Sequence, residues 1–229
     1  MNSRVIVGSK GCTILFARLD MKKFFLISFF VALFSLGSGA YAQTVDTSSP
    51  DTLVKTVTQQ VMDSIRADKS IQQGDINEIT KLVNEKILPY MDFHRTTQLA
   101  MGRNWRAATP DQQTAVIEQF KMLLIRTYAG ALAQVRNQQI QYKPFRMSPD
   151  DTDAVVRSVV MNNGSPIELD YRLYKTPQGW RVYDINVLGA WLIQAYQQQF
   201  NEQIQQKGVD GLIQFLTQRN QQLAAGKQS

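Results

Sequence analysis

The stretch from 166 to 200 constrains the fold most, because it reads as two strands, a tight turn and a long helix. Apolar and polar residues alternate from 167 to 174, which is typical of a half-buried strand. Pro177 and Gly179 predict a tight turn, after which a second strand returns from 180 to 187. Beyond Gly189 the large apolar residues recur at every fourth position, which indicates a helix. Three side chains of the second strand are expected on one face: Tyr183, Ile185 and Val187.

The rest of the chain predicts more helices and two further strands. A Pro or an Asp at a helix start, and a Gly or a Pro at a helix end, mark most of the boundaries. Four consecutive strands with short turns favour an antiparallel meander. We therefore expect an α+β fold in which about six helices wrap a twisted antiparallel four-stranded sheet. The expected ranges are helices at 50–68, 76–88, 92–102, 109–135, 190–200 and 209–216, strands at 140–145 and 154–161, and a hairpin turn at 162–165.

Residues 1–42 have the features of an upstream extension followed by a secretory signal peptide. Met21 begins a short basic segment, residues 24–36 are almost wholly apolar, and Ala40-Tyr41-Ala42 has the A-x-A pattern of a cleavage site. The alternative is an uncleaved membrane anchor, but an apolar run of about 13 residues is shorter than the roughly 20 that cross a bilayer. We expect translation to start at Met21 and the mature chain, residues 43–229, to be one α+β domain in the periplasm.

Charge and cysteine content narrow the function classes. The chain has 25 basic and 19 acidic residues, of which five basic and one acidic residue lie in 1–42, so residues 43–229 carry a net charge of +2. Such a balance does not predict nucleic-acid binding, which needs a concentrated basic face. The single cysteine, Cys12, lies in the expected signal region. The mature chain therefore has no disulfide and no cysteine nucleophile or metal ligand.

No residue pattern predicts catalysis or a metal site. His94 is the one histidine and has no His or Cys at ligand spacing. Glu168 and Asp170 share one strand face and are expected to face water. Asp184 lies among large apolar residues, so a hydrogen-bonded structural role is favoured, with a general base as the alternative. What remains is an excess of aromatic and aliphatic side chains, which either fill a core or line an apolar cavity.

Four segments, in order along the chain, share a likeness with one protein family. They are residues 88–113, 118–132, 166–189 and 204–216. They include Asp92-Phe93, the run Trp180-x-Val182-Tyr183-Asp184 and the run Gly208-Val-Asp-Gly-Leu212. These segments resemble the MlaC family, the periplasmic phospholipid-binding proteins of the maintenance-of-lipid-asymmetry pathway. Leu188, Trp191, Ala195 and Gln197 stand where many members of the family carry an acid, a small or hydroxyl residue, an Asn and an Arg, so the bulky Trp191 and the lost Arg at Gln197 depart from the family pattern.

The resemblance implies a carrier with no cofactor and no enzymatic activity. Its bound ligand would be a phospholipid, and it would shuttle lipids between an outer-membrane lipoprotein–porin complex and an inner-membrane ABC transporter with an MCE-domain subunit. The expected fold then encloses an apolar cavity, as in an NTF2-like cone. Two alternatives stay open, an NTF2-like enzyme that uses Asp184 and an adaptor with a solid core. The residues expected to line the cavity are Phe93, Leu124, Tyr128, Tyr171, Val182, Val187, Leu192 and Tyr196.

Overall fold

The structure is a computed structural model that describes residues 45–162 and 165–226. The expected signal peptide at 1–42 and the centre of the expected turn at 162–165 lie outside the described residues. Thr44–Ser229 is a unit of its own, and the fold is described for that unit alone. Its helices are α1 (Pro50–Ala67), α2 (Lys69–Gln72), α3 (Ile76–Leu82), the π-helix η1 (Val83–Ile87), the 3₁₀ helix η2 (Leu88–Tyr90), α4 (Phe93–Met101), the 3₁₀ helix η3 (Gly102–Ala107), α5 (Pro110–Ala133) and α6 (Leu192–Ala224).

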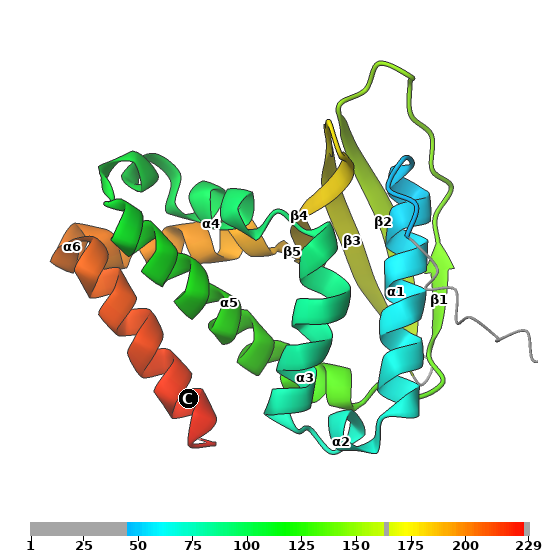
Figure 1. The fold of residues 1–229 in the computed structure, drawn as a ribbon, viewed down its shortest axis with the longest axis horizontal. Helices are drawn as coiled ribbons and strands as arrows, with labels where there is room; N and C mark the ends of the chain where they lie inside the picture. Colours follow the sequence, from blue (N-terminus) through cyan, green and yellow to red (C-terminus); the bar gives the residue numbers. More distant parts are fainter. Residues whose placement is uncertain (1–44, 163–164, 227–229) are drawn as a thin grey trace, which may run out of the picture. The chain divides into compact units, whose positions relative to one another are not determined.

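The sheet is antiparallel throughout and follows the order of the chain, β1-β2-β3-β4-β5. The sheet is open, with β1 and β5 at its edges. That this open sheet forms an NTF2-like cone remains a prediction. Figure 1 shows the helices α4, α5 and α6 on one side of the drawing and the sheet with α1 on the other. The strands are β1 (Gln139–Tyr142), β2 (Asp153–Asn162), β3 (Ser165–Thr176), β4 (Gly179–Val187) and β5 (Ala190–Trp191).

The prediction of four strands was wrong, because β5 adds a fifth. Leu188 and Gly189 have φ values of 55° and 87°, so both turn residues are left-handed, as in the tight hairpin turns that match strand twist. This turn lets Val187 pair with Ala190 and Asn186 with Trp191. The sequence concealed the hairpin, because a leucine is not a residue that left-handed turns favour.

A β-bulge in β4 corrects the expected placement of Tyr183. Leu173 pairs with Val182 but Arg172 pairs with Asp184, so Tyr183 is the extra residue. Its ring packs against Tyr174, with the ring centroids 5.8 Å apart, whereas Ile185 pairs with Tyr171 on the other face. A strict alternation along the strand cannot reveal an inserted residue, and for that reason the prediction that Tyr183 shares a face with Ile185 was wrong.

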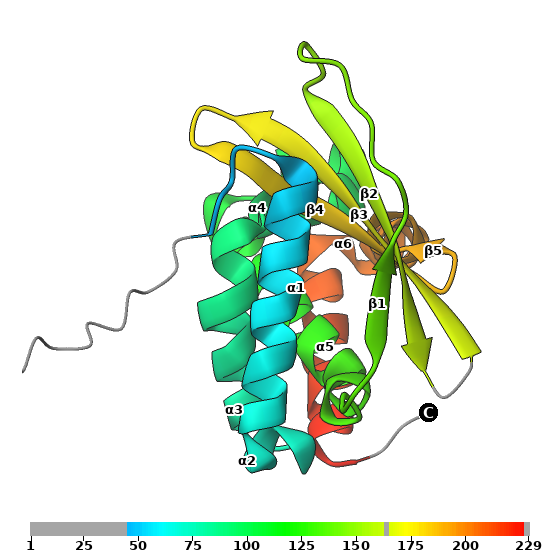
Figure 2. The same ribbon diagram turned by 90° about the vertical axis from the view of Figure 1, so that its right-hand side faces the viewer.

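Both faces of the sheet are covered, which also corrects the prediction for Asp170. On the first face lie α1, η1 and η2, and in Figure 2 α1 runs across the sheet with α3 beside it. On the second face, α4 and the start of α6 contact β4. Asp170 was expected to face water but is buried on this second face, where its carboxylate accepts a hydrogen bond from the Ser158 N–H at 3.2 Å. Asp184 and Asn186 on the neighbouring strand are buried there too.

Most helix boundaries follow from local side-chain chemistry. Asp92 caps α4 by accepting a hydrogen bond from the Arg95 N–H at 2.8 Å. Thr109 and Gln112 form a capping box at the start of α5. The prediction of separate helices at 190–200 and 209–216 needs adjustment, because α6 runs through both and is interrupted only by the non-helical Gly208.

Three clusters of buried apolar residues hold the unit together. One cluster joins α1 to the first face of the sheet. Another joins α4, η3, α5 and α6, and the third joins α1, α2, α3, η1 and α5. Each buried aliphatic or aromatic side chain contributes roughly 1.5–3 kcal/mol relative to an exposed one. Val57 packs against both the first and the third cluster, so these two clusters meet at α1.

Candidate functional site

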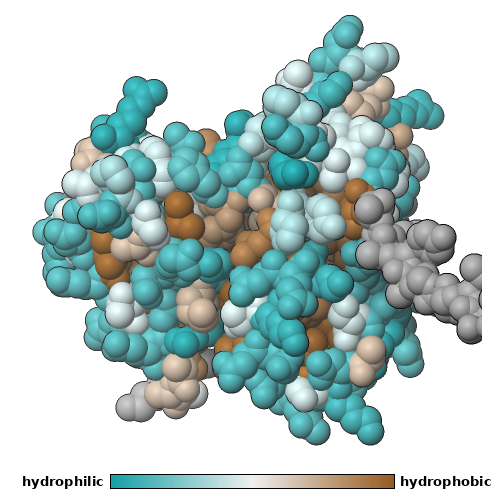
Figure 3. Space-filling view, viewed as in Figure 1, coloured by the Kyte–Doolittle hydropathy of each residue, from teal (hydrophilic) through white to brown (hydrophobic). Residues whose placement is uncertain are grey.

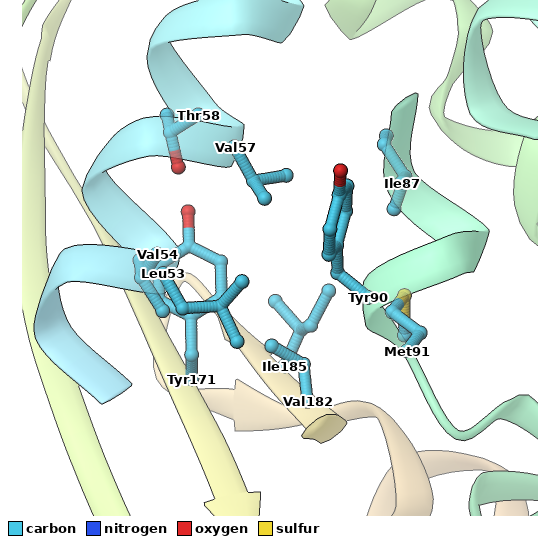
Figure 4. Close-up of a pocket in the computed structure, with 10 residues that line it drawn as sticks. All are labelled: Leu53, Val54, Val57, Thr58, Ile87, Tyr90, Met91, Tyr171, Val182 and Ile185. Atoms are coloured by element: carbon cyan, nitrogen blue, oxygen red, sulfur yellow. The ribbon is translucent and has the colours of Figure 1, made fainter. Parts of the chain in front are cut away.

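An apolar pocket lies between α1, the η1–η2 segment and the first face of the sheet, which is the face that α1 covers. Figure 4 shows its lining side chains converging from these elements. The amphipathic spacing of α1 directs four of them toward the sheet, and Pro89 ends the preceding helix so that Tyr90 and Met91 face the pocket. The lining residues are Leu53, Val54, Val57, Thr58, Ile87, Tyr90, Met91, Tyr171, Val182 and Ile185.

The polar groups of the pocket are hydroxyls. The hydroxyl of Thr58 points toward that of Tyr171 in Figure 4, within hydrogen-bonding reach. Burial raises the pKa of Tyr171 well above its ordinary value, so this phenol stays neutral. The lining therefore carries no charge, and it suits hydrocarbon chains better than an ionic ligand.

The pocket is small as it stands. Its volume is about 50 Å³, whereas sites that bury a whole small-molecule ligand measure about 300–1,000 Å³. An acyl chain therefore fits only if α1 or the η1–η2 segment moves away from the sheet. The η1–η2 segment is suited to such movement, because π- and 3₁₀-helical turns have poorer hydrogen-bond geometry than α-helix and recur at functional sites.

A second apolar region lies among α4, α5 and α6. Phe120 is fully buried, and the rings of Phe93, Tyr196 and Phe200 surround it with centroid distances of 5.5, 4.8 and 5.0 Å. Leu124 packs against the same cluster. Figure 3 shows hydrophobic side chains gathered in a hollow between α5 and α3, beneath α4. This face of the unit thus presents apolar surface at a concave place.

The structure divides the eight predicted lining residues between these regions. Tyr171 and Val182 line the pocket. Phe93, Leu124 and Tyr196 belong to the region around Phe120, and Tyr128 lies near Tyr196. Two residues fall in neither region. They are Val187, half-buried on β4 opposite Leu169, and Leu192, buried at the start of α6.

Sequence reasoning missed most of the pocket lining. Leu53 and Val57 were visible as part of an amphipathic stripe, but a stripe does not reveal which of its residues face a cavity. The positions of Tyr90 and Met91 in the lining are explained by Pro89, because the proline ends the helix and the chain then runs along the edge of the sheet beside Val182. Ile185 could have been assigned only with the register of β3 and β4 known.

Asp184 has a structural position. Its side chain is fully buried, and one carboxylate oxygen accepts a hydrogen bond from Arg172 at 3.0 Å. The other oxygen accepts the N–H groups of Ile185 and Ile193, so it also holds the start of α6. Burial raises the pKa of Asp184, while Ile193 and Arg172 oppose the shift. A carboxylate that is engaged on both oxygens and lies outside the pocket lining is badly placed to act as a general base.

No metal centre or membrane span emerges from the described residues. Within 45–162 and 165–226, no three His, Cys, Asp or Glu side chains gather closely enough to hold a metal ion. Over the same ranges, no helix is both long and apolar enough to cross a membrane. His94 is exposed and packs edge-on against Trp105, with the ring centroids 4.9 Å apart.

The family model described as "MlaC protein" matches residues 55–218, which is most of the chain. The chain belongs to the MlaC family. Two named MlaC-type relatives are similar in sequence over most of their length. The intermembrane phospholipid transport system binding protein MlaC of Haemophilus influenzae is 24% identical over 200 residues, covering 85% of this chain and 92% of the relative. The toluene tolerance protein ttg2D of Pseudomonas putida is 26% identical over 168 residues, covering 73% of this chain and 78% of the relative.

A solved structure of the same kind supports the MlaC fold directly. It is the phospholipid-binding protein of Ralstonia solanacearum in complex with a phospholipid, 53% identical to this chain with a TM-score of 0.76. The match covers 77% of this chain and 99% of the Ralstonia protein. The α+β architecture is thus shared with the Ralstonia protein, whose structure contains a phospholipid.

Proposed function

We propose that this protein is a soluble periplasmic phospholipid carrier, without enzymatic activity or a cofactor. The observation that carries the proposal is the Ralstonia structure, because a protein 53% identical to this chain holds a phospholipid on the same fold. The apolar, uncharged pocket and the hollow between α5 and α3 supply surface of the kind that acyl chains require.

The energetics favour an internal site for the lipid tails. Each buried CH₂ contributes about 0.8 kcal/mol, so two chains of roughly 16 carbons contribute at most about 25 kcal/mol. A flat surface patch leaves much of each chain in water. The chains therefore enter the interior, and we propose that they occupy both the pocket and the neighbouring region that contains Phe93, Leu124, Tyr128 and Tyr196, with Val187 and Leu192 at their margins.

The carrier would receive and deliver its lipid through membrane-bound partners. We propose that these are an outer-membrane lipoprotein–porin complex and an inner-membrane ABC transporter with an MCE-domain subunit. Support comes from family membership and from the name of the Haemophilus relative, which describes intermembrane phospholipid transport. The two alternatives are less favoured, because Asp184 is engaged by its neighbours and because an apolar pocket exists.

Filling the pocket tests this function. Val57→Trp places a large ring in the pocket, so the protein purified without detergent should lose most of its bound phospholipid, measured by native mass spectrometry. Gln59→Trp is the matched control, because Gln59 lies on the same helix but is exposed, and this variant should keep its lipid. A wild-type protein that carries no phospholipid from its native periplasm would refute the proposal.

A further inference from the structure

Arg95, in the first turn of α4, is held between two aromatic rings. Its guanidinium carbon lies 4.1 Å from the ring centroid of Tyr174 and 4.9 Å from that of Tyr183. The two rings are nearly perpendicular, at 77°, so they confine the guanidinium on two sides. Cation–π contacts of this kind fix the orientation of an arginine without using any of its N–H donors.

Within the part of the chain that the structure describes, Arg95 donates a hydrogen bond through its backbone N–H and none through its side chain. Its Nε atom is buried without a hydrogen-bond partner, and its guanidinium forms no ion pair in residues 45–162 and 165–226. A buried donor without an acceptor costs about 1–3 kcal/mol. Native proteins normally satisfy such groups, so the unsatisfied Nε of Arg95 is an exception that calls for an explanation.

Neighbouring carboxylates are already engaged. One oxygen of Asp92 accepts the Arg95 backbone N–H, and the other accepts the Tyr174 hydroxyl. That hydrogen bond raises the pKa of Tyr174, while the positive charges of Arg95 and Arg181 oppose the shift. Arg181 pairs with Tyr174 across β3 and β4, so it is a second cation close to the same ring.

Two other carboxylates lie near the rings that hold Arg95, because Asp153 pairs with Tyr174 across β2 and β3 and Asp184 follows Tyr183 on β4. Burial raises the pKa of Tyr183, with Asp153 and Asp184 adding to the shift and with Arg172 and Arg95 opposing it. Asp184 is paired with Arg172. Asp153 accepts a hydrogen bond from Thr152 and forms no ion pair within the described ranges. The donors of Arg95 thus remain open to an added anion.

Arg95 and the two rings that clamp it lie on the second face of the sheet, beyond the β4 edge at which the pocket ends. Met91 and Val182 line the pocket and pair across the edge of β4. The residues that follow these two lie outside the pocket lining. Asp92 follows Met91, and its N–H donates a hydrogen bond to the Val182 carbonyl oxygen at 2.8 Å, while Tyr183 follows Val182 on β4. Asp92 and Tyr183 then hold Arg95. A lipid whose chains enter beside Met91 and Val182 would carry its polar group toward this edge.

We propose that Arg95, assisted by Arg181, binds a phosphate group, and that in the loaded protein this is the phosphate of the lipid. The second half of this inference rests on the proposed function. A guanidinium is suited to phosphate because its planar, forked donors match two phosphate oxygens at once. The aromatic clamp supplies the preorganisation, because it holds the fork in place before the ligand arrives.

Thermal unfolding of delipidated protein tests the phosphate site. Inorganic phosphate should raise the Tm of the wild type by about 2–4 °C at saturation, compared with sodium chloride at equal ionic strength. Arg95→Met keeps an apolar stem between the rings and should abolish the shift, and Arg95→Lys should retain part of it. Arg103→Met is the matched control, because Arg103 is an exposed arginine on the adjacent η3, and it should shift like the wild type.

Lipid loading distinguishes a head group from free phosphate. The wild type should take up a diacyl phospholipid about tenfold better than the diacylglycerol that lacks phosphate, and Arg95→Met should lose this preference. A phosphate shift in Tm without any lipid preference would assign the site to free phosphate and overturn the head-group assignment. If the wild type carries phospholipid but shows neither effect, Arg95 only fastens α4 to the sheet. A wild type without bound lipid would instead refute the proposed function.

Discussion

Leu188 occupies a backbone conformation that disfavours a leucine. Its φ of 55° is left-handed, a region that costs a residue with a branched side chain roughly 1–2 kcal/mol relative to glycine or asparagine. The side chain is 69% exposed, so little packing offsets that cost. The strain lies at the turn that creates β5.

Replacing this leucine should therefore stabilise the protein. Leu188→Asn relieves the strain while keeping the turn, and we expect the free energy of unfolding to rise by up to about 1 kcal/mol, equivalent to a Tm increase of about 2–4 °C. Differential scanning calorimetry measures the change. Leu188→Ala is the control, because alanine lacks the short polar side chain whose local hydrogen bonds let asparagine tolerate this conformation, and it should give no gain. An asparagine variant less stable than the wild type would show that Leu188 makes contacts that outweigh its strain.

At the scale of elements, α6 is two helical segments joined at Gly208. The glycine has φ 69° and ψ −174°, a combination open essentially to glycine alone, and an added Cβ there would meet no atom within 4 Å. The constraint on this position is therefore conformational and not steric. The break matters for packing, because both segments of α6 contribute buried residues to the cluster around Phe120.

A pair of glycine substitutions separates these effects. Gly208→Ala should destabilise the protein by about 1–3 kcal/mol, because alanine must either adopt the strained conformation or straighten α6. Gly130→Ala, in the interior of α5 and with equal space for a Cβ, should stabilise it by about 0.5–1 kcal/mol. Urea denaturation measures both. Equal effects of the two substitutions would show that the break at Gly208 is not required.

The same elements show what the sequence could and could not predict. Local signals were sufficient where one residue determines the structure, as at the Asp92 cap, the capping box of Thr109 and the strand around Tyr171. They failed where pairing determines it, because neither the bulge at Tyr183 nor the β5 hairpin has a reliable pattern of its own. The pocket needs contacts between α1, η2 and β4, which are distant in sequence, so its lining was predicted only in part.

For the whole molecule, the central problem is volume. A pocket of about 50 Å³ cannot hold even one acyl chain, although a protein 53% identical to this chain holds a phospholipid. The sheet is joined by long antiparallel pairings, notably β2 with β3, and it is the least suited part to move. The η1–η2 segment contacts β4 over only a few residues and carries Ile87, Tyr90 and Met91 on or beside it.

Opening of the pocket should therefore be concentrated in the η1–η2 segment. We expect amide hydrogen exchange in residues 83–91 to be slower in lipid-loaded than in delipidated protein, because bound chains pack against this segment and suppress its opening. The amides of β2 and β3 serve as an internal control and should exchange equally in both states, since their pairing does not depend on the ligand. Exchange measured by mass spectrometry on peptides from both regions gives the comparison. A uniform change across the molecule, or one confined to α5 and α6, would place the moving element elsewhere and leave the η1–η2 segment as a fixed wall.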